Sequence, residues 1–184
     1  MYTMFISDIH GSAYWCQKAL ELFEGQKCDR LILLGDLLYH GPRNDLPREY
    51  DCKRVIAMLN SYKDKIAMAV RGNCDAEVDQ MVLSFPMMAD YVSMDVKGHT
   101  LFITHGHVYN DEIKPNLNKG DFLLHGHFHV PKWKDYGNYT SLNPGSISIP
   151  KENSWHGVMT YKDGEFAWWD IDKAEIVHTL QVEE

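Results

Sequence analysis

The first 70 residues alternate short apolar runs with amphipathic segments, and this alternation limits the fold more than any other feature. Three apolar runs predict strands, at residues 4–7, 31–34 and 66–70. Between them, residues 12–23 and 52–62 carry apolar side chains at helical spacing, and Ser12 is a candidate N-cap. A β-α-β-α-β order predicts parallel strands covered by helices.

After Phe85-Pro86 the pattern becomes rich in strands. Turn-forming dipeptides and tripeptides containing glycine separate these segments. The predicted strands are residues 90–96, 100–104, 121–124, 138–142, 146–149, 155–161, 165–171 and 174–182. No linker, repeat or low-complexity run divides the chain. We therefore expect one α/β domain over residues 1–184, with two packed sheets and helices outside.

Composition is ordinary for a globular protein, with 45% hydrophobic and 24% charged residues. No apolar run approaches the ~20 residues of a membrane span, and the N-terminus lacks a signal-peptide pattern, so we expect a cytoplasmic protein without membrane attachment. The four cysteines form no C-x-x-C pair, which fits a reducing compartment. The net charge of −8 disfavours long nucleic acids but not a small phosphate substrate.

Polar side chains follow five of the predicted strands where each strand ends. They are Asp8 and His10, Gly35-Asp36, Arg71-Gly72-Asn73, His105, and His125-Gly126-His127-Phe128-His129. Ligands of open α/β sheets bind at the carboxyl ends of strands. Five such endings indicate one shared site.

The donor inventory of this site is Asp8, His10, Asp36, Asn73, His105, His127 and His129. Seven ligands are more than one tetrahedral metal site can hold. They suit two metal ions that share a bridging carboxylate, either Asp8 or Asp36. Imidazole, carboxylate and amide donors without thiolate fit Mn²⁺, Fe or Zn²⁺ better than Ca²⁺, and Ni²⁺ is a further candidate.

Five motif blocks occur in order: Asp8-Ile9-His10, Gly35-Asp36, Gly72-Asn73-Cys74-Asp75, His105-Gly106-His107 and Gly126-His127-Phe128-His129. Through them the chain resembles the calcineurin-like metallophosphoesterases. It is most similar to small bacterial phosphodiesterases of the YfcE type, through residues 35–44, 71–75 and 143–146. The resemblance implies a four-layer α/β/β/α sandwich with two mixed β-sheets.

The resemblance also implies site roles. One metal would be held by Asp8, His10, Asp36 and His129, and the other by Asp36, Asn73, His105 and His127, so that Asp36 bridges. Mn²⁺ commonly supports activity in the family. The implied reaction is hydrolysis of a small phosphodiester by a hydroxide that the two metals activate, with Asp36, Asn73 and His105 at the catalytic centre.

One departure from the family pattern concerns the substrate. Many relatives have histidine after the Gly-Asn pair, where this chain has Cys74. A thiol is a weak donor for a poor leaving group, which predicts a preference for diesters with good leaving groups over alkyl monoesters. The candidate substrate-binding residues are therefore Cys74 itself, His40 and His107 as substitute donors, and Arg43 as a phosphate contact. We expect the segments Gly106–Gly120 and His40–Tyr50 to shape the pocket.

Several residues are better explained, or equally well explained, by a structural role than by a role in the site. His99, His156 and His178 are interpreted as structural, His125 is left open, and Asp75 is expected to support the site rather than to bind metal. Trp168 and Trp169 should face opposite sides of a strand, so that one is exposed and favours a homo-oligomer. An apolar hairpin-like stretch around Met81–Tyr91 supports the same prediction.

Two other functions remain open from the sequence. The first is a catalytically inactive scaffold of the same fold, as in the retromer subunit that resembles these enzymes. The second is a protein phosphatase or nuclease. All seven donor positions are filled, which favours an enzyme over the scaffold. Cys74, the short chain and the acidic charge disfavour the phosphatase and the nuclease.

Overall fold

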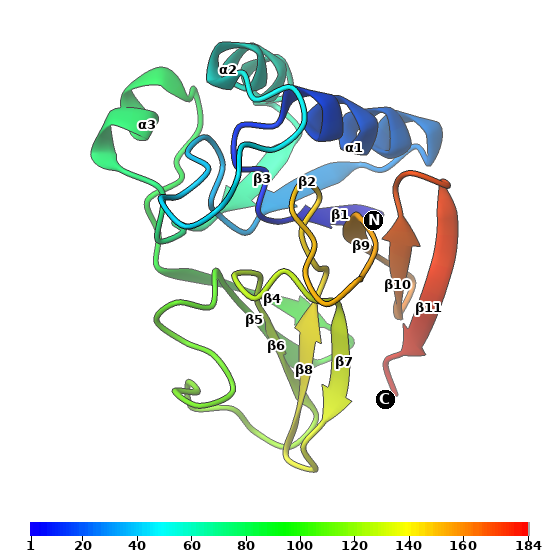
Figure 1. The fold of residues 1–184 in the computed structure, drawn as a ribbon. Coiled ribbons are helices and arrows are strands. Elements are labelled where there is room, and N and C mark those ends of the chain that lie inside the picture. Colours follow the sequence, from blue (N-terminus) through cyan, green and yellow to red (C-terminus); the bar gives the residue numbers. More distant parts are fainter. Residues whose placement is uncertain (184) are drawn as a thin grey trace.

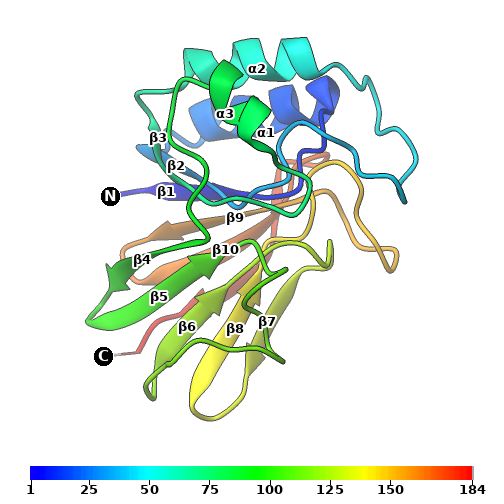
Figure 2. The ribbon, with the colours of Figure 1, turned by 90° about the vertical axis from the view of Figure 1, so that its left-hand side faces the viewer.

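The computed structural model describes residues 1–183 and contains two β-sheets packed face to face (Figures 1 and 2). The first sheet has six strands, which in spatial order are β11 (Glu175–Gln181), β10 (Glu165–Asp170), β9 (Gly157–Lys162), β1 (Thr3–Ile6), β2 (Arg30–Leu33) and β3 (Ile66–Ala69). β1, β2 and β3 are parallel, as the β-α-β-α-β pattern predicts, and β9, β10 and β11 are added as an antiparallel extension.

The second sheet is also mixed. Its five strands in spatial order are β4 (Tyr91–Val96), β5 (His99–Thr104), β6 (Asp121–Leu124), β8 (Tyr139–Asn143) and β7 (Lys132–Asp135). The three central strands are parallel, and the two edge strands pair antiparallel to their neighbours. Both sheets therefore carry parallel strands whose carboxyl ends can form a shared site.

Three helices lie over the first sheet (Figures 1 and 2): α1 (Ala13–Gly25), α2 (Cys52–Ser61) and α3 (Glu77–Val82). The Ser12 hydroxyl accepts a hydrogen bond from the Trp15 amide at 3.4 Å, which confirms the predicted N-cap. Asp51 caps α2 in the same way, through the Arg54 amide at 3.1 Å. Within residues 1–183, no helix has the length and apolar character to cross a membrane.

Two hydrophobic cores hold the layers together. One lies between the helices and the first sheet, and it includes Trp15, Phe23 and Leu31. The other lies between the sheets, where Phe5 and Trp168 of the first sheet belong to the same cluster as the side chains of the second sheet. Burial at about 25 cal/mol per Å² of apolar surface makes these cores the main favourable term in folding.

The second core brings the carboxyl ends of strands from both sheets to one place. β1 and β2 run in register from Thr3 opposite Arg30 to Ile6 opposite Leu33, so the loops after them start at the same level. The Nδ1 atom of His105, just after β5, donates to the Leu34 carbonyl at 2.6 Å. This bond ties the end of β5 to the end of β2.

The two mixed sheets of the expected sandwich are confirmed. The outer face of the second sheet is covered by the segment 105–120, whose Tyr109 ring packs edge-on against Phe102 and Tyr91. This segment contains no helix in the described part of the chain, so the outermost layer is a loop.

Some local predictions are wrong. Residues 146–149 form no strand, although Ser-Ile-Ser-Ile alternates. The sequence reading missed both β7 and α3. Residues 83–90 form no hairpin, since only a single bridge joins Val70 to Ala89 there.

The expected exposed tryptophan is also absent. Trp168 is 0% and Trp169 6% exposed, because the first sheet has a hydrophobic core on each of its two faces. That argument for a homo-oligomer therefore fails. Met81 is 83% exposed on α3, whereas Phe85 and Met87 are buried. Association of this chain with itself stays a prediction.

Candidate metal centre

The backbone at the strand ends turns sharply, and this turn directs the polar side chains inward. Five of the seven predicted ligands have positive φ: Asp8 (56°), His10 (48°), Asp36 (54°), His127 (65°) and His129 (62°). A left-handed conformation at a residue other than glycine is strained, and such strain gathers at functional sites. The fold therefore holds these residues in place at a cost in stability.

Asp8 lies at the bottom of the site and is fully buried. Its Oδ2 atom accepts hydrogen bonds from the Ser7 hydroxyl at 2.6 Å and from the His127 amide at 3.1 Å. Its Oδ1 atom is buried and has no hydrogen-bond partner. The same atom lies 3.2 Å from Nε2 of His129 and 3.7 Å from Nε2 of His10. An unpaired buried carboxylate oxygen beside two imidazole nitrogens is suited to a cation.

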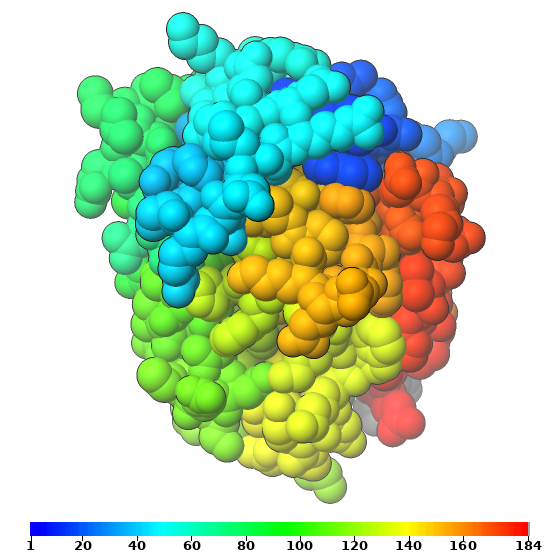
Figure 3. Space-filling model, in the orientation of Figure 1, coloured from blue at the N-terminus to red at the C-terminus, as the bar shows by residue number. Residues whose placement is uncertain are grey.

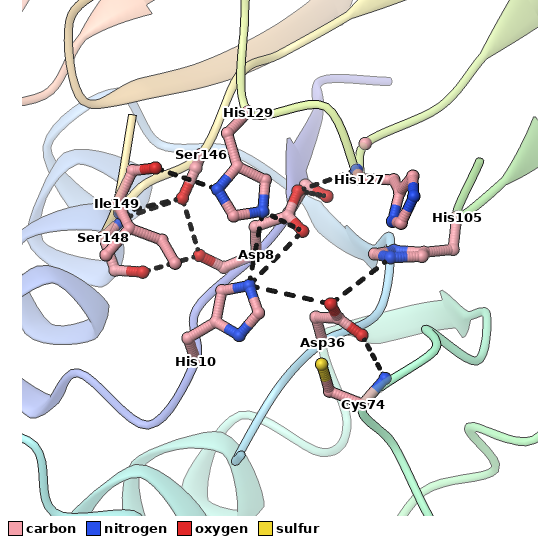
Figure 4. Close-up of polar contacts among 12 residues, drawn as sticks. Asp8, His10, Asp36, Cys74, His105, His127, His129, Ser146, Ser148 and Ile149 are labelled. Carbon is pink, nitrogen blue, oxygen red and sulfur yellow. Dashed lines mark hydrogen bonds and ion pairs between the residues drawn. The ribbon is translucent and has the colours of Figure 1, made fainter. Parts of the chain in front are cut away.

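Asp36 stands between two groups of donors. Its Oδ1 atom accepts a hydrogen bond from the Cys74 amide at 2.8 Å. Its Oδ2 atom lies 3.6 Å from Nε2 of His10 and 3.4 Å from Nε2 of His105 (Figure 4). One carboxylate oxygen thus faces donors from the ends of β1 and β5, as a bridging ligand requires.

Three of the histidines are oriented by backbone carbonyls. The Nδ1 atom of His10 lies 2.8 Å from the Tyr39 carbonyl oxygen, and that of His129 lies 2.8 Å from the Ile149 carbonyl oxygen. His105 makes the corresponding contact described above. A carbonyl only accepts, so Nδ1 carries the proton and the Nε2 lone pair points into the site. This is the tautomer that binds metal.

The two remaining predicted ligands complete the second donor group. The side-chain Oδ1 of Asn73 lies 3.2 Å from Nε2 of His105. The His127 ring centroid is 5.2 Å from that of His105. Geometry identifies three compact donor triads among the described residues: Asp8, His10 and His129; Asp8, Asp36 and His105; and His10, Asp36 and Cys74.

Asp75 supports the site without entering it. Its carboxylate accepts hydrogen bonds from the amides of Asp36 (2.8 Å), Leu37 (2.8 Å) and Gly72 (2.7 Å). These contacts join the loop after β2 to the loop after β3. The structure therefore agrees with the predicted supporting role.

Two glycines allow the loops to approach the carboxylates. A Cβ atom on Gly72 would lie 2.1 Å from Oδ1 of Asp36, and one on Gly126 would lie 1.8 Å from the Ser7 hydroxyl oxygen and 2.7 Å from Oδ2 of Asp8. Any larger residue at either position would displace a carboxylate of the site.

The electrostatics show how strongly the carboxylates act on the imidazoles. Burial opposes ionisation of Asp8, but the neighbouring imidazoles of His129 and His10 outweigh it and hold the pKa of Asp8 well below its usual range. Burial likewise opposes protonation of His105, yet Asp36 and Asp8 raise its pKa to about 9. Burial and the neighbouring His105 lower the pKa of His127 to about 4, so His127 is a neutral donor at pH 7.

A cavity of about 290 Å³ opens above these donors. Its lining includes Arg43 and Cys74, two of the predicted substrate-binding residues, and also Asn44 and Lys151. Lys151 was missed because a single lysine in a loop carries no pattern. Its amide donates to the His129 carbonyl at 3.1 Å, which fixes the loop beside the metal ligands.

The other two predicted substrate-binding residues lie outside this lining. His40 packs edge-on against Tyr39 and Tyr50, and its Nδ1 atom is buried without a partner. His107 lies with its ring centroid 5.4 Å from that of His105, so it is near the site but not at the cavity wall.

Of the two segments predicted to shape the pocket, only one lines the metal cavity. Residues 41–44 of the His40–Tyr50 segment line the metal cavity. Residues 110–112 of the Gly106–Gly120 segment instead line a separate cavity, because that segment folds over the outer face of the second sheet. His125 belongs there too: its Nε2 atom is 3.3 Å from the Ser141 hydroxyl. His99, His156 and His178 also lie away from the donor groups, as expected.

The donor chemistry fits a pair of divalent cations. Four imidazoles, two carboxylates and one amide are gathered around the unpaired Asp8 oxygen and the shared Asp36 oxygen, and a bound cation would displace the second ring proton that the raised pKa of His105 implies. A family model for the calcineurin-like phosphoesterase superfamily domain matches residues 1–164.

The chain belongs to the calcineurin-like phosphoesterase superfamily.

Among members of this superfamily, the Escherichia coli K12 protein named Phosphodiesterase YfcE is 47% identical over 151 residues, which is 82% of each chain. A solved structure of the E. coli phosphoesterase Yfce covers all of both chains with a TM-score of 0.95 at 39% identity. A zinc complex of Vps29 from Entamoeba histolytica has a TM-score of 0.61 at 15% identity, and this likeness concerns the fold alone.

Proposed function

We propose that the protein is a metal-dependent phosphodiesterase that acts on small phosphodiesters, with residues 1–184 forming one domain. The observation that carries the proposal is Oδ2 of Asp36, which faces His10 on one side and His105 on the other. The relative named as a phosphodiesterase at 47% identity supports the same reaction class.

Two divalent cations would occupy this centre. Asp8, His10, Asp36 and His129 would hold the first, and Asp36, Asn73, His105 and His127 would hold the second. When bound, such ions lower the pKa of water and neutralise phosphate oxygens, which supplies the nucleophile and the charge stabilisation for hydrolysis. Mn²⁺ is the proposed ion because it is what the family resemblance implies, and the same donor set also suits Zn²⁺, Fe and Ni²⁺.

The chain's own residues position the substrate. Arg43 and Lys151 line the metal cavity and place positive charge beside the phosphate. His10, Asp36 and His129 line the cavity, and together with Asp8 and His105 they are only 0% to 3% exposed. A low local dielectric strengthens every charge interaction there.

Cys74 governs the choice of leaving group in this proposal. Burial and the charge of Asp36 raise the pKa of the Cys74 thiol to about 12. A thiol with that pKa remains protonated at pH 7 and gives little help to an alkoxide. Diesters with good leaving groups are therefore the preferred substrates. We expect the protein to act in the cytoplasm.

The alternatives are less well supported. An inactive scaffold has no need to keep seven donors and a strained backbone around an orphan carboxylate oxygen. A protein phosphatase or nuclease is disfavoured by Cys74 in place of the family histidine and by the net charge of −8, which repels a polyanionic backbone.

Hydrolysis with restored metal tests the proposal. Chelated protein is assayed on bis(p-nitrophenyl) phosphate and p-nitrophenyl phosphate with Mn²⁺, Zn²⁺, Ni²⁺, Mg²⁺ or no metal. We expect metal-dependent cleavage that favours the diester. A folded protein that cleaves neither compound with any ion would contradict the proposal, and faster turnover of the monoester than of the diester would contradict the inferred preference.

A further inference from the structure

A second cavity, of about 660 Å³, adjoins the metal cavity. The two share a wall built from the segment 126–130, along which successive side chains alternate. His127 and His129 line the metal cavity, whereas Phe128 and Val130 line the second one. The loop before β9 divides in the same way, with Lys151 in the first lining and Glu152 in the second.

Phe128 connects the two spaces. Its ring centroid is 5.1 Å from that of His127, a proposed metal ligand, and 5.5 Å from that of His125, which lines the second cavity. Phe128 is 48% exposed, so its ring stands at the surface between the two openings. In Figure 3, the orange segment before β9 and the yellow-green segment after β6 lie on the same face of the molecule.

The second cavity is built to take an organic group rather than a second phosphate. Phe128, Val130, Pro131 and Tyr136 supply apolar and aromatic surface. Its buried polar lining is Asn143 and His125, each 1% exposed. Aromatic and aliphatic walls with a few fixed polar groups are typical of small-molecule sites.

The charges of this cavity disfavour an anionic group. Its single cationic residue, Lys132, forms an ion pair with Asp111. Glu112 and Glu152 add two further carboxylates to the lining. An additional phosphate or carboxylate on the substrate would meet like charge there.

The geometry also indicates which ester group this cavity meets. The proposed metal ligands Asp8, His10, Asp36, His105 and His129 are 0% to 3% exposed, so a nucleophile supplied by ions bound there would approach phosphorus from the buried side. In-line displacement would then direct the leaving group away from the buried side, toward solvent. Only the segment 127–130 separates the second cavity from the metal cavity, so an ester group that stays on phosphorus would be the one to enter it.

We propose that the second cavity binds the retained ester group of the phosphodiester, and that this group is an uncharged organic substituent with a flat ring. The inference rests on the proposed function, since it concerns the substrate of the same centre. The retained ester group stays bound in the second cavity both before and after the bond to the leaving group breaks. It can therefore hold the phosphorus atom in place throughout the reaction.

A series of diesters with a constant leaving group tests this inference. Methyl, phenyl and carboxymethyl p-nitrophenyl phosphate all release p-nitrophenol, and only the retained group differs. We expect kcat/KM for the phenyl diester to exceed that of the methyl diester by about 10-fold, mainly through KM, and the carboxymethyl diester to be the poorest substrate. Equal values for the phenyl and methyl diesters would overturn the inference.

Filling the cavity provides the second part of the test. Val130→Trp should remove most of the advantage of the phenyl diester, so that the phenyl-to-methyl ratio of kcat/KM falls from about 10 to about 2. Val130→Phe is the milder variant if Val130→Trp does not fold. Val177→Trp, on the exposed strand β11, is the matched control. An unchanged phenyl-to-methyl ratio in folded Val130→Trp and Val130→Phe would overturn the inference.

Failure of the wider proposal gives a different result. If the protein is no phosphodiesterase, wild type cleaves none of the three diesters with any metal. Calorimetric titration with phenyl phosphate and methyl phosphate, the products that keep the retained group, provides a readout that does not depend on turnover. Phenyl phosphate should bind wild type about 10-fold more tightly than methyl phosphate does, and Val130→Trp should abolish the difference.

Discussion

The Nε2 atom of His129 lies 3.2 Å from Oδ1 of Asp8, a fully buried oxygen that no hydrogen-bond donor satisfies. These two residues are 121 positions apart in the chain. They meet because β1 and β6, which precede them, belong to sheets that pack against each other. A buried carboxylate oxygen left without a donor costs about 1–3 kcal/mol, which a bound cation would offset.

The first prediction concerns stability. Adding Mn²⁺ at about 100 times its dissociation constant to chelated protein should stabilise it by about 2.7 kcal/mol, because the ion binds only the folded state. For a chain of this size that raises Tm by about 5–10 °C. Asp8→Asn, which removes a ligand of the first ion, should reduce the shift, and the control Asp64→Asn, an exposed position, should keep it in full. A wild-type Tm that does not respond to Mn²⁺ would contradict the proposed centre.

The second prediction concerns Asp75, whose carboxylate accepts three backbone amides. Asp75→Asn replaces one acceptor oxygen by a donor that faces other donors, so we expect a loss of about 3 kcal/mol in the free energy of unfolding. Urea denaturation at pH 7 measures this loss. Asp79→Asn, which alters a single amide contact in α3, should cost less than about 1 kcal/mol. Similar losses in both variants would show that Asp75 does not hold the two loops together.

The third prediction concerns acid stability. Burial opposes ionisation of Asp111, but the neighbouring His125 and the ion pair with Lys132 outweigh it and hold the pKa of Asp111 well below its usual range. The unfolded chain therefore binds a proton at higher pH than the folded one, and this stabilisation is present at neutral pH and lost as pH falls below about 4.

Asp111→Asn tests the sign of this linkage. The variant should lose about 1 kcal/mol at pH 7, a figure that allows for solvent screening of the ion pair, and should lose less stability than wild type between pH 7 and pH 3. Thermal melts at the two pH values measure both effects. A steeper decline in the variant than in wild type would contradict the assignment.

The fourth prediction concerns Cys74. Because burial and Asp36 raise the pKa of its thiol to about 12, no thiolate is available as a nucleophile at pH 7 to 9. Cys74→Ala should therefore retain kcat for bis(p-nitrophenyl) phosphate within about 3-fold. A loss above about 100-fold in a folded variant would assign Cys74 a direct chemical role.

The sequence predicted for a physical reason that these polar side chains lie close together. Parallel strands place their carboxyl ends at one edge of a sheet, so the polar residues after β1 and β2 were constrained to lie together, as were those after β5 and β6, and the packing of the two sheets brings the two sets to one place. The local periodicity of the chain carried that information. The positive φ values of Asp8 and Asp36 carried no such signal, since a left-handed residue other than glycine has no distinctive pattern.

The false strand at residues 146–149 has an identifiable cause. The hydroxyls of Ser146 and Ser148 both donate to the Asp8 carbonyl, at 2.9 and 2.8 Å. The Ser146 hydroxyl also accepts the amides of Ser148 and Ile149. Such side-chain bonds to the backbone compete with a strand ladder and hold the segment against the metal centre instead.

β7 and α3 were not predicted because their sequences are short or charged. β7 reads Lys-Trp-Lys-Asp and is an edge strand, where charged residues are ordinary but give no alternation of apolar and polar side chains. α3 has only six residues and buries none of them fully, so no apolar stripe marks it. The course of the segment 105–120 depends on contacts such as Tyr109 with Phe102, which sequence spacing alone does not indicate.

The number of ions bound per chain tests the dinuclear centre most directly. Native mass spectrometry of chelated protein titrated with Mn²⁺ should show two ions on wild type. His129→Ala, which removes a ligand of the first ion only, should retain one ion. Asp36→Asn, which removes the charge of the shared ligand, should weaken both. Saturation of wild type at one ion, or two ions retained tightly by Asp36→Asn, would contradict a pair of metals bridged by Asp36.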